Sequence, residues 1–558
     1  MAKIKIWIAK WLLLLATSLT AMSASAYSFE AINDDGITLY YIITSFSEPY
    51  TVEICSKDYD FNSYSGDINI PSSVTYSGIT YMVTAIGSYT FRDCDGLTSV
   101  TIPESVEDIG GLAFWGCSSI TSITIPESVT YISNKAFGDC TSLTTVNYNA
   151  TNCTSMATGQ HPQFENCPNL TTLNIGENVQ AMPEDAFIDC KSLTTVNYNA
   201  TNCSQMGSYN YPVFNGCSNI TAINIGENVE IIPSYAFKGC SALASITIPE
   251  SVSTIGMAVF QDCTSLSAIY SKFASEDNRC LIIDGSLIAF AQSGLTEYTI
   301  PEGITTIGES AFSHCNDLTS VTIDGTVSTI GYMAFSYCTG LTSVTIGESV
   351  TTIEPCAFWC SSGLSSIIIG NSVTKIGYSA FVECTSLTSV VIGESVSAIE
   401  SCTFLNCTNL ESLTIGNSVA TIAENAFGGC EKLQYITIGE NIEYIGGEVF
   451  DDCPKLKVLK CDSPTPPGLG ENVFNKSAYS KCMLIVPEGS IEAYKAAEGW
   501  RDFFNISGIE GVVADKTDCE ELDVEFFTLQ GVKVADKDLA PGIYVRRVGD
   551  KVEKVLVK

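Results

Sequence analysis

Residues 109–130 read IGGLAFWGCSSITSITIPESVT, and close variants of this phrase recur through most of the chain. The interval between successive repeat phenylalanines is 23 residues in most cases, 27 residues twice and 52 residues once. The 52-residue interval is long enough to hold one further coil without the Phe-Cys phrase, around residues 281–307. Self-similarity at a fixed period of this length predicts a solenoid of stacked coils. The fifteen phenylalanines are Phe91, Phe114, Phe137, Phe164, Phe187, Phe214, Phe237, Phe260, Phe312, Phe335, Phe358, Phe381, Phe404, Phe427 and Phe450.

One short stretch of the repeat has the alternation of a half-buried strand. In LTSVTI (97–102), apolar and polar residues follow one another. We expect Val100 and Ile102 to point into the coil and Ser99 and Thr101 to point out. The Pro-Glu-Ser that follows ends the strand and turns the chain.

The rest of the repeat is expected to close the coil. Val106 and Ile109 are apolar and three residues apart, which suits a second buried side. Ala113 and Phe114 begin a short helical or 3₁₀ turn on the outer side, where Phe114 fills the wide end of the core. Cys117 then enters the interior just before the next strand.

Stacking about 16 coils of this kind gives a leucine-rich-repeat solenoid with one parallel β-sheet, its strands about 4.8 Å apart. A single coil cannot bury its own apolar side chains, so stability depends on neighbouring coils and on a cap at each end. We expect a β-rich N-terminal cap, and a C-terminal cap made of a strand at 483–487 and a helix over 491–497. The predicted parts are a signal peptide (1–26), the N-terminal cap (27–83), the solenoid (84–457), the C-terminal cap (458–507) and a linker with a small β module (508–558).

The first 26 residues have the features of an export signal. A lysine-bearing start is followed by an apolar run and by Ala24-Ser25-Ala26, a small-x-small cleavage site. No later apolar run approaches the roughly 20 residues that span a membrane. We therefore expect a secreted or surface-exposed chain that begins at Tyr27 and has no transmembrane segment.

Composition argues against several classes of partner. The formal net charge of the 558-residue chain is −35, from 27 basic and 62 acidic side chains. So acidic a surface repels nucleic acid and anionic membranes. With only two histidines, His161 and His314, the chain has few groups for acid–base catalysis.

The repeat phrase resembles that of the BspA-like leucine-rich-repeat proteins. The resemblance covers about residues 84–457, and the caps are also similar to those of that family. It implies a bacterial surface or secreted protein that adheres to host matrix proteins, mucin or other bacteria, and it implies no catalysis. The stretches 527–534, 539–545 and 555–558 are similar to C-terminal sorting modules of secreted Bacteroidetes proteins.

The 24 cysteines mostly follow the repeat. Fourteen copies carry a cysteine three residues after the phenylalanine, and the copy at Phe358 departs from this pattern. Equivalent cysteines in adjacent coils point the same way, so we interpret them as buried thiols rather than disulfides. Cys461 and Cys482, both in the C-terminal cap, could pair or remain free. Cys153 and Cys203 lie two coils apart, about 10 Å, which is too far for a bond.

No motif for metal binding, a cofactor or nucleophilic catalysis is present. The sequence lacks G-x-S-x-G, H-E-x-x-H and the phosphate-binding loop, and its Cys and His residues lack zinc-site spacing. An alternative hypothesis places a hydrolytic site in the irregular segment 264–311, with Tyr270-Ser271-Lys272 and Glu276-Asp277.

A glutamate recurs in the turn after the strand, so stacking the coils gives an acidic stripe. A role in solubility explains the stripe. The functional alternative is that the stripe binds a row of Ca²⁺ ions or a basic partner. Single carboxylates about 5 Å apart do not form an oxygen cage, which favours the first explanation. The glutamates include Glu104, Glu127, Glu177, Glu227, Glu250, Glu348, Glu394 and Glu440.

The exposed strand face is the best candidate binding surface. Most of its positions are Ser or Thr, but successive coils carry an amide instead, and two coils carry an aromatic ring. Amides offer both donors and acceptors to a peptide or glycan. The longer loops of the two 27-residue coils are expected to protrude in the same region. The candidate ligand-binding residues are Asn147, Asn174, Asn197, Asn224, Tyr270 and Tyr435.

The sequence thus predicts an exported, monomeric solenoid that is not an enzyme, needs no cofactor and binds an extracellular protein or glycan. A structural surface-layer protein is the alternative that remains open beside the hydrolase.

Overall fold

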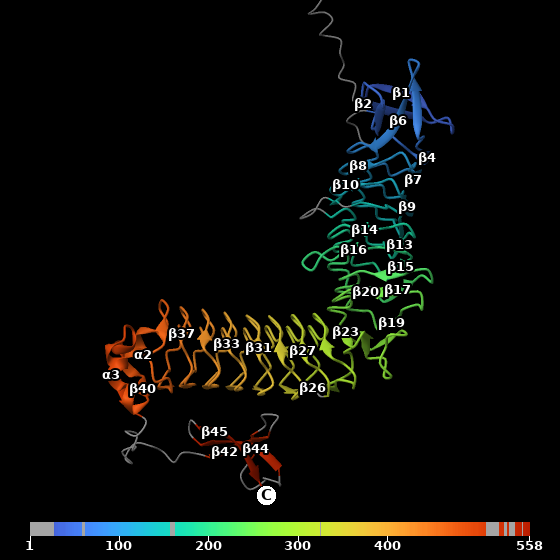
Figure 1. Ribbon diagram of the computed structural model, residues 1–558. Helices are drawn as coiled ribbons and strands as arrows, with labels where there is room; N and C mark the ends of the chain where they lie inside the picture. Colours follow the sequence, from blue (N-terminus) through green and yellow to red (C-terminus); the bar gives the residue numbers. More distant parts are fainter. Residues whose placement is uncertain are drawn as a thin grey trace, which may run out of the picture. The chain divides into compact units, whose positions relative to one another are not determined.

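The structure, a computed structural model, describes residues 27–57, 62–153, 155–156, 162–323, 325–508 and four strands between 524 and 557. The predicted signal peptide lies outside these residues. The chain divides into two compact units, Met1–Gly256 and Met257–Lys558. Both are built from stacked coils of parallel strands, which confirms the predicted leucine-rich-repeat solenoid (Figure 1).

The first unit begins with a small antiparallel cap. Its strands join an eight-stranded sheet that continues into the first coils. Phe29 stacks on Tyr76 at 4.3 Å and on Tyr41 at 5.3 Å, so aromatic packing fills the cap. The cap strands are β1 (Phe29–Ile32), β2 (Thr38–Ser45), β3 (Thr51–Cys55), β5 (Ser73–Tyr76) and β6 (Ile79–Ile86).

Each coil of the first unit carries two strands on opposite sides, as Figure 1 shows for β15 and β16. The long strands are β4 (Gly66–Asn69), β7 (Leu97–Thr101), β9 (Ser122–Ile125), β11 (Thr145–Tyr148), β13 (Thr172–Ile175), β15 (Thr195–Tyr198), β17 (Ala222–Ile225) and β19 (Ser245–Thr247). The short strands are β8 (Asp108–Ile109), β10 (Tyr131–Ile132), β12 (Ser155–Met156), β14 (Ala181–Met182), β16 (Gln205–Met206), β18 (Ile231–Ile232) and β20 (Thr254–Ile255). The prediction of one parallel sheet therefore missed a second ladder, formed where we expected only a buried apolar side.

The second unit repeats the arrangement. Its long strands are β21 (Ala268–Tyr270), β24 (Glu297–Thr299), β26 (Ser320–Ile323), β28 (Ser343–Ile346), β30 (Ser366–Ile369), β32 (Ser389–Ile392), β34 (Ser412–Ile415), β36 (Tyr435–Ile438), β38 (Val458–Cys461), β40 (Met483–Val486) and β41 (Asn505–Gly508). From β24 onward they form one ten-stranded sheet. The short strands are β25 (Thr306–Ile307), β27 (Thr329–Ile330), β29 (Thr352–Ile353), β31 (Lys375–Ile376), β33 (Ala398–Ile399), β35 (Thr421–Ile422), β37 (Tyr444–Ile445) and β39 (Gly468–Leu469).

The further coil expected in the 52-residue interval is present. A hairpin of β22 (Cys280–Ile283) and β23 (Ser286–Phe290) occupies it, and β23 pairs with β25 in the short-strand ladder. Phe290 stacks on Phe312 with ring centroids 4.5 Å apart, so it takes the place of the missing repeat phenylalanine.

The phenylalanines form a buried column in each unit. In the second unit the rings from Phe335 to Phe427 are nearly parallel, at centroid distances of 5.0–5.3 Å. The column reaches into the caps, where Tyr64 lies 5.0 Å from Phe91 and Phe474 lies 5.5 Å from Phe450. These contacts set the spacing of the coils on the turn side, between each short strand and the next long strand.

Turns around the phenylalanine replace the expected helical turn. Two bonds close consecutive turns: Trp115 N–H to Leu112 O and Cys117 N–H to Phe114 O, both 3.2 Å. The flanking residues Leu112 (φ 53°) and Gly116 (φ 74°) adopt the left-handed conformation. Because a helix needs consecutive right-handed residues, the chain turns tightly there without forming one.

The repeat cysteines are buried hydrogen-bond donors. In nine coils the Sγ donates to the carbonyl of the phenylalanine one coil earlier, as Cys407 does to Phe381 at 3.3 Å. In the copy that departs from the cysteine pattern, Ser361 fills the position and donates to Phe335 O at 2.6 Å. All cysteines in the described part of the chain are free, which supports the thiol interpretation.

Cys461 and Cys482 do not pair. Strand β38 pairs with β40 so that Leu459 faces Leu484, which places Cys461 and Cys482 at opposite ends of neighbouring strands. The Tyr494 hydroxyl donates to Cys461 Sγ at 3.2 Å instead. The possible disulfide is therefore absent.

The C-terminal cap closes the core with helices and aromatic rings. Buried Tyr494 and Trp500 cover the end of the phenylalanine column, and Trp500 Nε1 donates to Pro467 O at 2.8 Å. The cap contains α2 (Lys476–Lys481), η1 (Glu488–Ser490), α3 (Ile491–Ala496) and η2 (Trp500–Asp502). The helix expected at 491–497 and the strand expected at 483–487 correspond to α3 and β40, but β41 follows as one more strand.

The last residues form a separate four-stranded antiparallel sheet in the order β43-β42-β44-β45. Its strands are β42 (Val524–Thr528), β43 (Lys533–Val534), β44 (Gly542–Val548) and β45 (Lys551–Val557).

The hydroxyl of Ser361 should be replaceable by a thiol but not by a methyl group. Ser361→Ala removes a buried donor to Phe335 O, and we expect the free energy of unfolding to fall by about 1–2 kcal/mol. Ser361→Cys restores the donor found in the other coils and should retain most of the stability. Urea unfolding measures both, with Ser362→Ala as the neighbouring control. Equal losses for Ala and Cys would contradict the donor role.

Alkaline pH should destabilise the solenoid through its buried thiols. The thiol of an unfolded cysteine has a pKa of about 8.5. Burial in the folded chain raises the pKa of Cys167, Cys407 and Cys482 to about 12. Between these values the unfolded chain binds fewer protons than the folded chain, so the free energy of unfolding falls as pH rises. Urea unfolding at about pH 7.5 and about pH 10 tests this. A Cys384, Cys407 and Cys430 to Ser variant should show a smaller loss, and an identical loss would contradict the thiol origin.

Candidate functional site

The four predicted asparagines form a continuous ladder. They lie at equivalent positions of β11, β13, β15 and β17, directly opposite one another in register. Each side-chain amide donates to the Oδ1 of the preceding asparagine: Asn174 to Asn147 at 2.7 Å, Asn197 to Asn174 at 2.6 Å and Asn224 to Asn197 at 2.8 Å. Asn147 completes the row by donating to Thr124 Oγ1 at 3.1 Å.

The ladder leaves hydrogen-bonding capacity for a ligand. An amide has two N–H donors and an oxygen with two lone pairs, and the ladder bonds of Asn174 use one of each. The first three asparagines are half-buried and Asn224 is exposed. Because each amide is held by its neighbours, the row presents remaining donors and acceptors at the strand spacing of about 4.8 Å.

A second ladder borders the asparagines. Thr171 Oγ1 donates to Thr144 O, Thr194 Oγ1 to Thr171 O and Thr221 Oγ1 to Thr194 O, at 3.3–3.4 Å. On the inner side of the same strands, Tyr148 and Tyr198 are fully buried. The strand face is therefore fixed from both sides, and sequence patterns did not reveal this bonding.

Tyr270 and Tyr435 belong to different places. Tyr270 lies on β21 in the second unit, with 48% of its surface exposed. Tyr435 lies on β36, six strands along the ten-stranded sheet from β24, with Lys457 Nζ 5.9 Å from its ring centroid. The four asparagines are therefore brought together within the first unit, and Tyr270 and Tyr435 lie on separate strands of the second unit.

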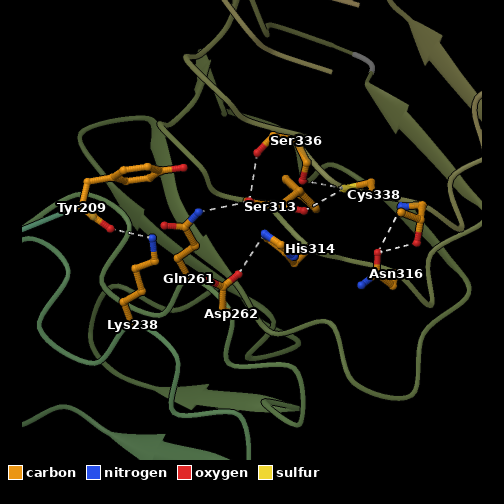
Figure 2. A network of polar contacts seen from close by, with 11 residues as sticks. Tyr209, Lys238, Gln261, Asp262, Ser313, His314, Asn316, Ser336 and Cys338 are labelled. Atoms are coloured by element: carbon orange, nitrogen blue, oxygen red, sulfur yellow. Dashed lines mark hydrogen bonds and ion pairs between the residues drawn. The ribbon is translucent and has the colours of Figure 1, made fainter. Parts of the chain in front are cut away.

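The longer loop of the second 27-residue coil follows the short strand β16. The loop after β16 is held by Lys238, whose Nζ donates to Tyr209 O at 2.9 Å and lies 3.9 Å from the Tyr209 ring centroid (Figure 2). Tyr211 in this loop is 50% exposed. The corresponding loop of the earlier coil, including His161, lies outside the described residues.

The irregular segment 264–311 holds a structural carboxylate. Burial would raise the pKa of Asp277, but hydrogen bonds from the Ser275 hydroxyl, the Arg279 N–H and the Tyr298 hydroxyl lower it. Ser271 Oγ accepts from Phe273 N–H at 3.1 Å and so closes a local turn. These bonds give Asp277 and Ser271 a role in holding the hairpin.

The acidic stripe has a structural task that the sequence did not reveal. Asn371 Oδ1 accepts from Glu394 N–H, a Glu394 carboxylate oxygen accepts from Asn417 N–H, and Asn417 Oδ1 accepts from Glu440 N–H, at 2.8–3.2 Å. Alternating side chains thus cap the turn of the next coil. Within the described residues, no group of three or more His, Cys, Asp or Glu is placed to hold a metal ion.

His314 lies in a polar network beside the hairpin (Figure 2). Its Nε2 lies 3.4 Å from Asp262 Oδ1. Buried Gln261 donates to Ser313 Oγ at 3.2 Å, and Ser313 and Ser336 share a hydrogen bond of 3.0 Å. In these bonds the partner of His314 is Asp262, and not a serine or cysteine nucleophile.

The repeat architecture is that of a known family. A model described as BspA type leucine rich repeat region (6 copies) matches residues 69–194, 157–276, 286–407 and 360–484, more than half of the chain. The chain belongs to the BspA-type leucine-rich repeat family. This confirms the family inferred from the repeat phrase. The similarity of residues 527–558 to sorting modules stays a prediction.

Solved structures of leucine-rich repeat proteins are similar to this BspA-type chain. A leucine-rich cell surface protein from Faecalibacterium prausnitzii is 25% identical, with 73% of this chain and 94% of that chain covered and a TM-score of 0.42. A leucine-rich repeat protein from Bacteroides ovatus is 26% identical, with 78% and 94% covered and a TM-score of 0.40. The pneumococcal vaccine antigen PcpA is 17% identical, with 78% and 94% covered and a TM-score of 0.43. No curated protein matches the chain.

The helices of the described part of the BspA-type chain are short. None of them combines the length and apolar character that crossing a membrane requires.

Breaking the asparagine ladder in its middle should cost stability. Asn174→Ala removes a donor to Asn147 and an acceptor for Asn197, and we expect the free energy of unfolding to fall by about 1–2 kcal/mol. Asn224→Ala removes only one ladder bond from the end and should cost about half as much. Chemical denaturation of both variants measures the difference. Equal costs at the two positions would show that the bonds do not act as a ladder.

Proposed function

We propose that this BspA-type protein is an exported bacterial surface or secreted protein that binds an extracellular protein or glycan. The asparagine ladder is the observation that carries the proposal. It is a row of four amides on parallel strands, where most other coils carry Ser or Thr. The proposed binding surface is this row and the hydroxyl ladder beside it.

Rigidity favours such a surface. The amides are oriented by their neighbours before a ligand arrives, so binding costs little side-chain entropy. Hydroxyl and amide groups of a glycan, or the backbone of an extended peptide, can use the remaining donors and acceptors. Tyr270 and Tyr435 remain candidate contacts on separate parts of the strand face.

The proposed surface location agrees with the family. The similar protein from Faecalibacterium prausnitzii is described as a cell surface protein. The predicted leader and sorting-like module are consistent with this location. Cell fractionation with protease treatment of intact cells tests it, and protein found only inside the cells would contradict export.

Binding should depend on the amides and not on the surrounding fold. We expect the chain beginning at Tyr27 to bind at least one of immobilised matrix proteins, mucin glycans or partner bacteria. Replacing Asn147, Asn174, Asn197 and Asn224 with threonine should reduce that binding by about tenfold, a loss equivalent to roughly one good hydrogen bond. Surface plasmon resonance measures both proteins.

A matched control replaces outward threonines of the second unit, Thr322, Thr345, Thr414 and Thr437, with serine. This control should bind as the unmodified chain does. Unchanged binding in the folded asparagine variant would contradict the proposed surface. Ordered self-association of the purified chain without any ligand would favour a structural surface-layer role instead.

A further inference from the structure

At one turn position of the repeat, eleven of the fifteen phrase-bearing coils carry Gly, Asp or Asn, and four consecutive coils carry other residue types. The residue two positions after the repeat phenylalanine has a positive φ in all fifteen phrase-bearing coils. The four exceptions in residue type are His314, Tyr337, Cys360 and Glu383. The other eleven are Gly, Asp or Asn: Asp93, Gly116, Asp139, Asn166, Asp189, Gly216, Gly239, Asp262, Asn406, Gly429 and Asp452.

Backbone conformation contributes to this preference. Gly, Asp and Asn adopt a positive φ most readily. Crowding is not general here: a Cβ on Gly216 would lie 2.5 Å from the side-chain Oδ1 of Asp189, whereas a Cβ on Gly239 would meet no atom within 4 Å. Many residue types occur two positions before the phenylalanine, where φ is also positive, so a positive φ alone does not select Gly, Asp and Asn. Four adjacent departures from the common residue types therefore set these coils apart from the other eleven.

The exceptions form a connected row along the turn face of the second unit. His314 lies 3.4 Å from Asp262 and stacks on Tyr337 with ring centroids 4.8 Å apart (Figure 2 shows its first contact). The Cys360 thiol donates to Glu383 Oε2 at 3.3 Å, and it also forms a hydrogen bond with the Tyr337 hydroxyl. We call Asp262, His314, Tyr337, Cys360 and Glu383 the turn-face row.

The row has a carboxylate at each end and rings in the middle. Trp359, half-buried, adds a third ring, 5.2 Å from Tyr337 and tilted by 58°. Beneath the row, buried Ser313 and Ser336 bond to each other, and they directly precede His314 and Tyr337 in the chain. The buried bond holds the two rings in place before any ligand binds.

The segment that carries the row is acidic. Residues 262–383 contain 12 acidic side chains and three basic side chains, Lys272, Arg279 and Lys375. Lys375 is itself paired with Glu354 at 3.1 Å. The field over this face therefore attracts cations.

We propose that the turn-face row binds an extended basic segment of another polypeptide. Its Arg or Lys side chains pair with Asp262 and Glu383, and its middle packs along His314, Tyr337 and Trp359. The rings favour this occupant because Arg and Lys stems pack on aromatic side chains and their cationic heads are attracted to them. This surface is separate from the asparagine ladder, so the inference does not rest on the proposed function.

The spacing sets the length of the segment. Asp262 and Glu383 are five coil steps apart, roughly 24 Å at the strand spacing. An extended chain covers this distance in about seven or eight residues. The matching probe is therefore an octa-arginine peptide.

The test uses the chain from Tyr27 and a variant that restores a common residue type, with His314, Tyr337 and Glu383 all changed to Asn. Isothermal titration calorimetry should show that octa-arginine binds the unmodified chain and that the variant binds about tenfold more weakly, as expected for losing one ion pair and the aromatic contacts. The variant should unfold at the same or a higher urea concentration, because asparagine suits the turn.

Asp452→Asn is the matched control, because it removes one negative charge at the same repeat position outside the row. It should bind octa-arginine almost as the unmodified chain does. Equal weakening in the control and the variant would overturn the proposal by showing attraction to general acidity. A variant that is less stable than the unmodified chain would overturn it by showing that the row serves the fold. A neutral oligosaccharide whose binding depends on the row, with octa-arginine binding unchanged, would also overturn it.

Discussion

Every part of this solenoid depends on successive coils keeping the same rise on all sides. Parallel strands impose about 4.8 Å per coil, and the stacked phenylalanines match it on the turn side with centroids mostly about 5 Å apart. As a result, each repeat position meets the same position of the next coil. One interaction chosen at one position is then repeated as a column, which is how the ring, thiol, amide and turn-capping ladders arise.

The constraint explains why the interior can use polar groups. The phenylalanine carbonyl turns inward with the tight turns, and a small donor one coil later reaches it. A thiol supplies a donor while remaining nearly apolar. Ser361 makes the same hydrogen bond without sulfur.

Periodicity predicted what repeats and missed what depends on single contacts. The repeat period, the buried Phe and Cys, the outward Ser and Thr and the additional coil all follow from spacing and alternation. The two-residue strands of the second ladder are too short to show alternation, and Phe290 could not be recognised because its coil lacks the cysteine. Of the candidate site, the asparagines were found because they share a column. Tyr270 and Tyr435 were chosen by residue type, and they lie on β21 and β36 of the second unit.

The two proposed surfaces differ in whether the stability of the fold can explain their residues. Asparagines on a strand face fit the backbone and bond to one another, so stability alone could retain them. The turn-face row differs: His, Tyr, Cys and Glu replace the Gly, Asp and Asn that the other eleven coils carry at a turn position with positive φ. Such a departure is informative because it breaks the pattern of the chain's own repeats in adjacent coils. In a repeat protein the pattern can be read from the other coils of the same chain, so such departures can be found without any relative for comparison.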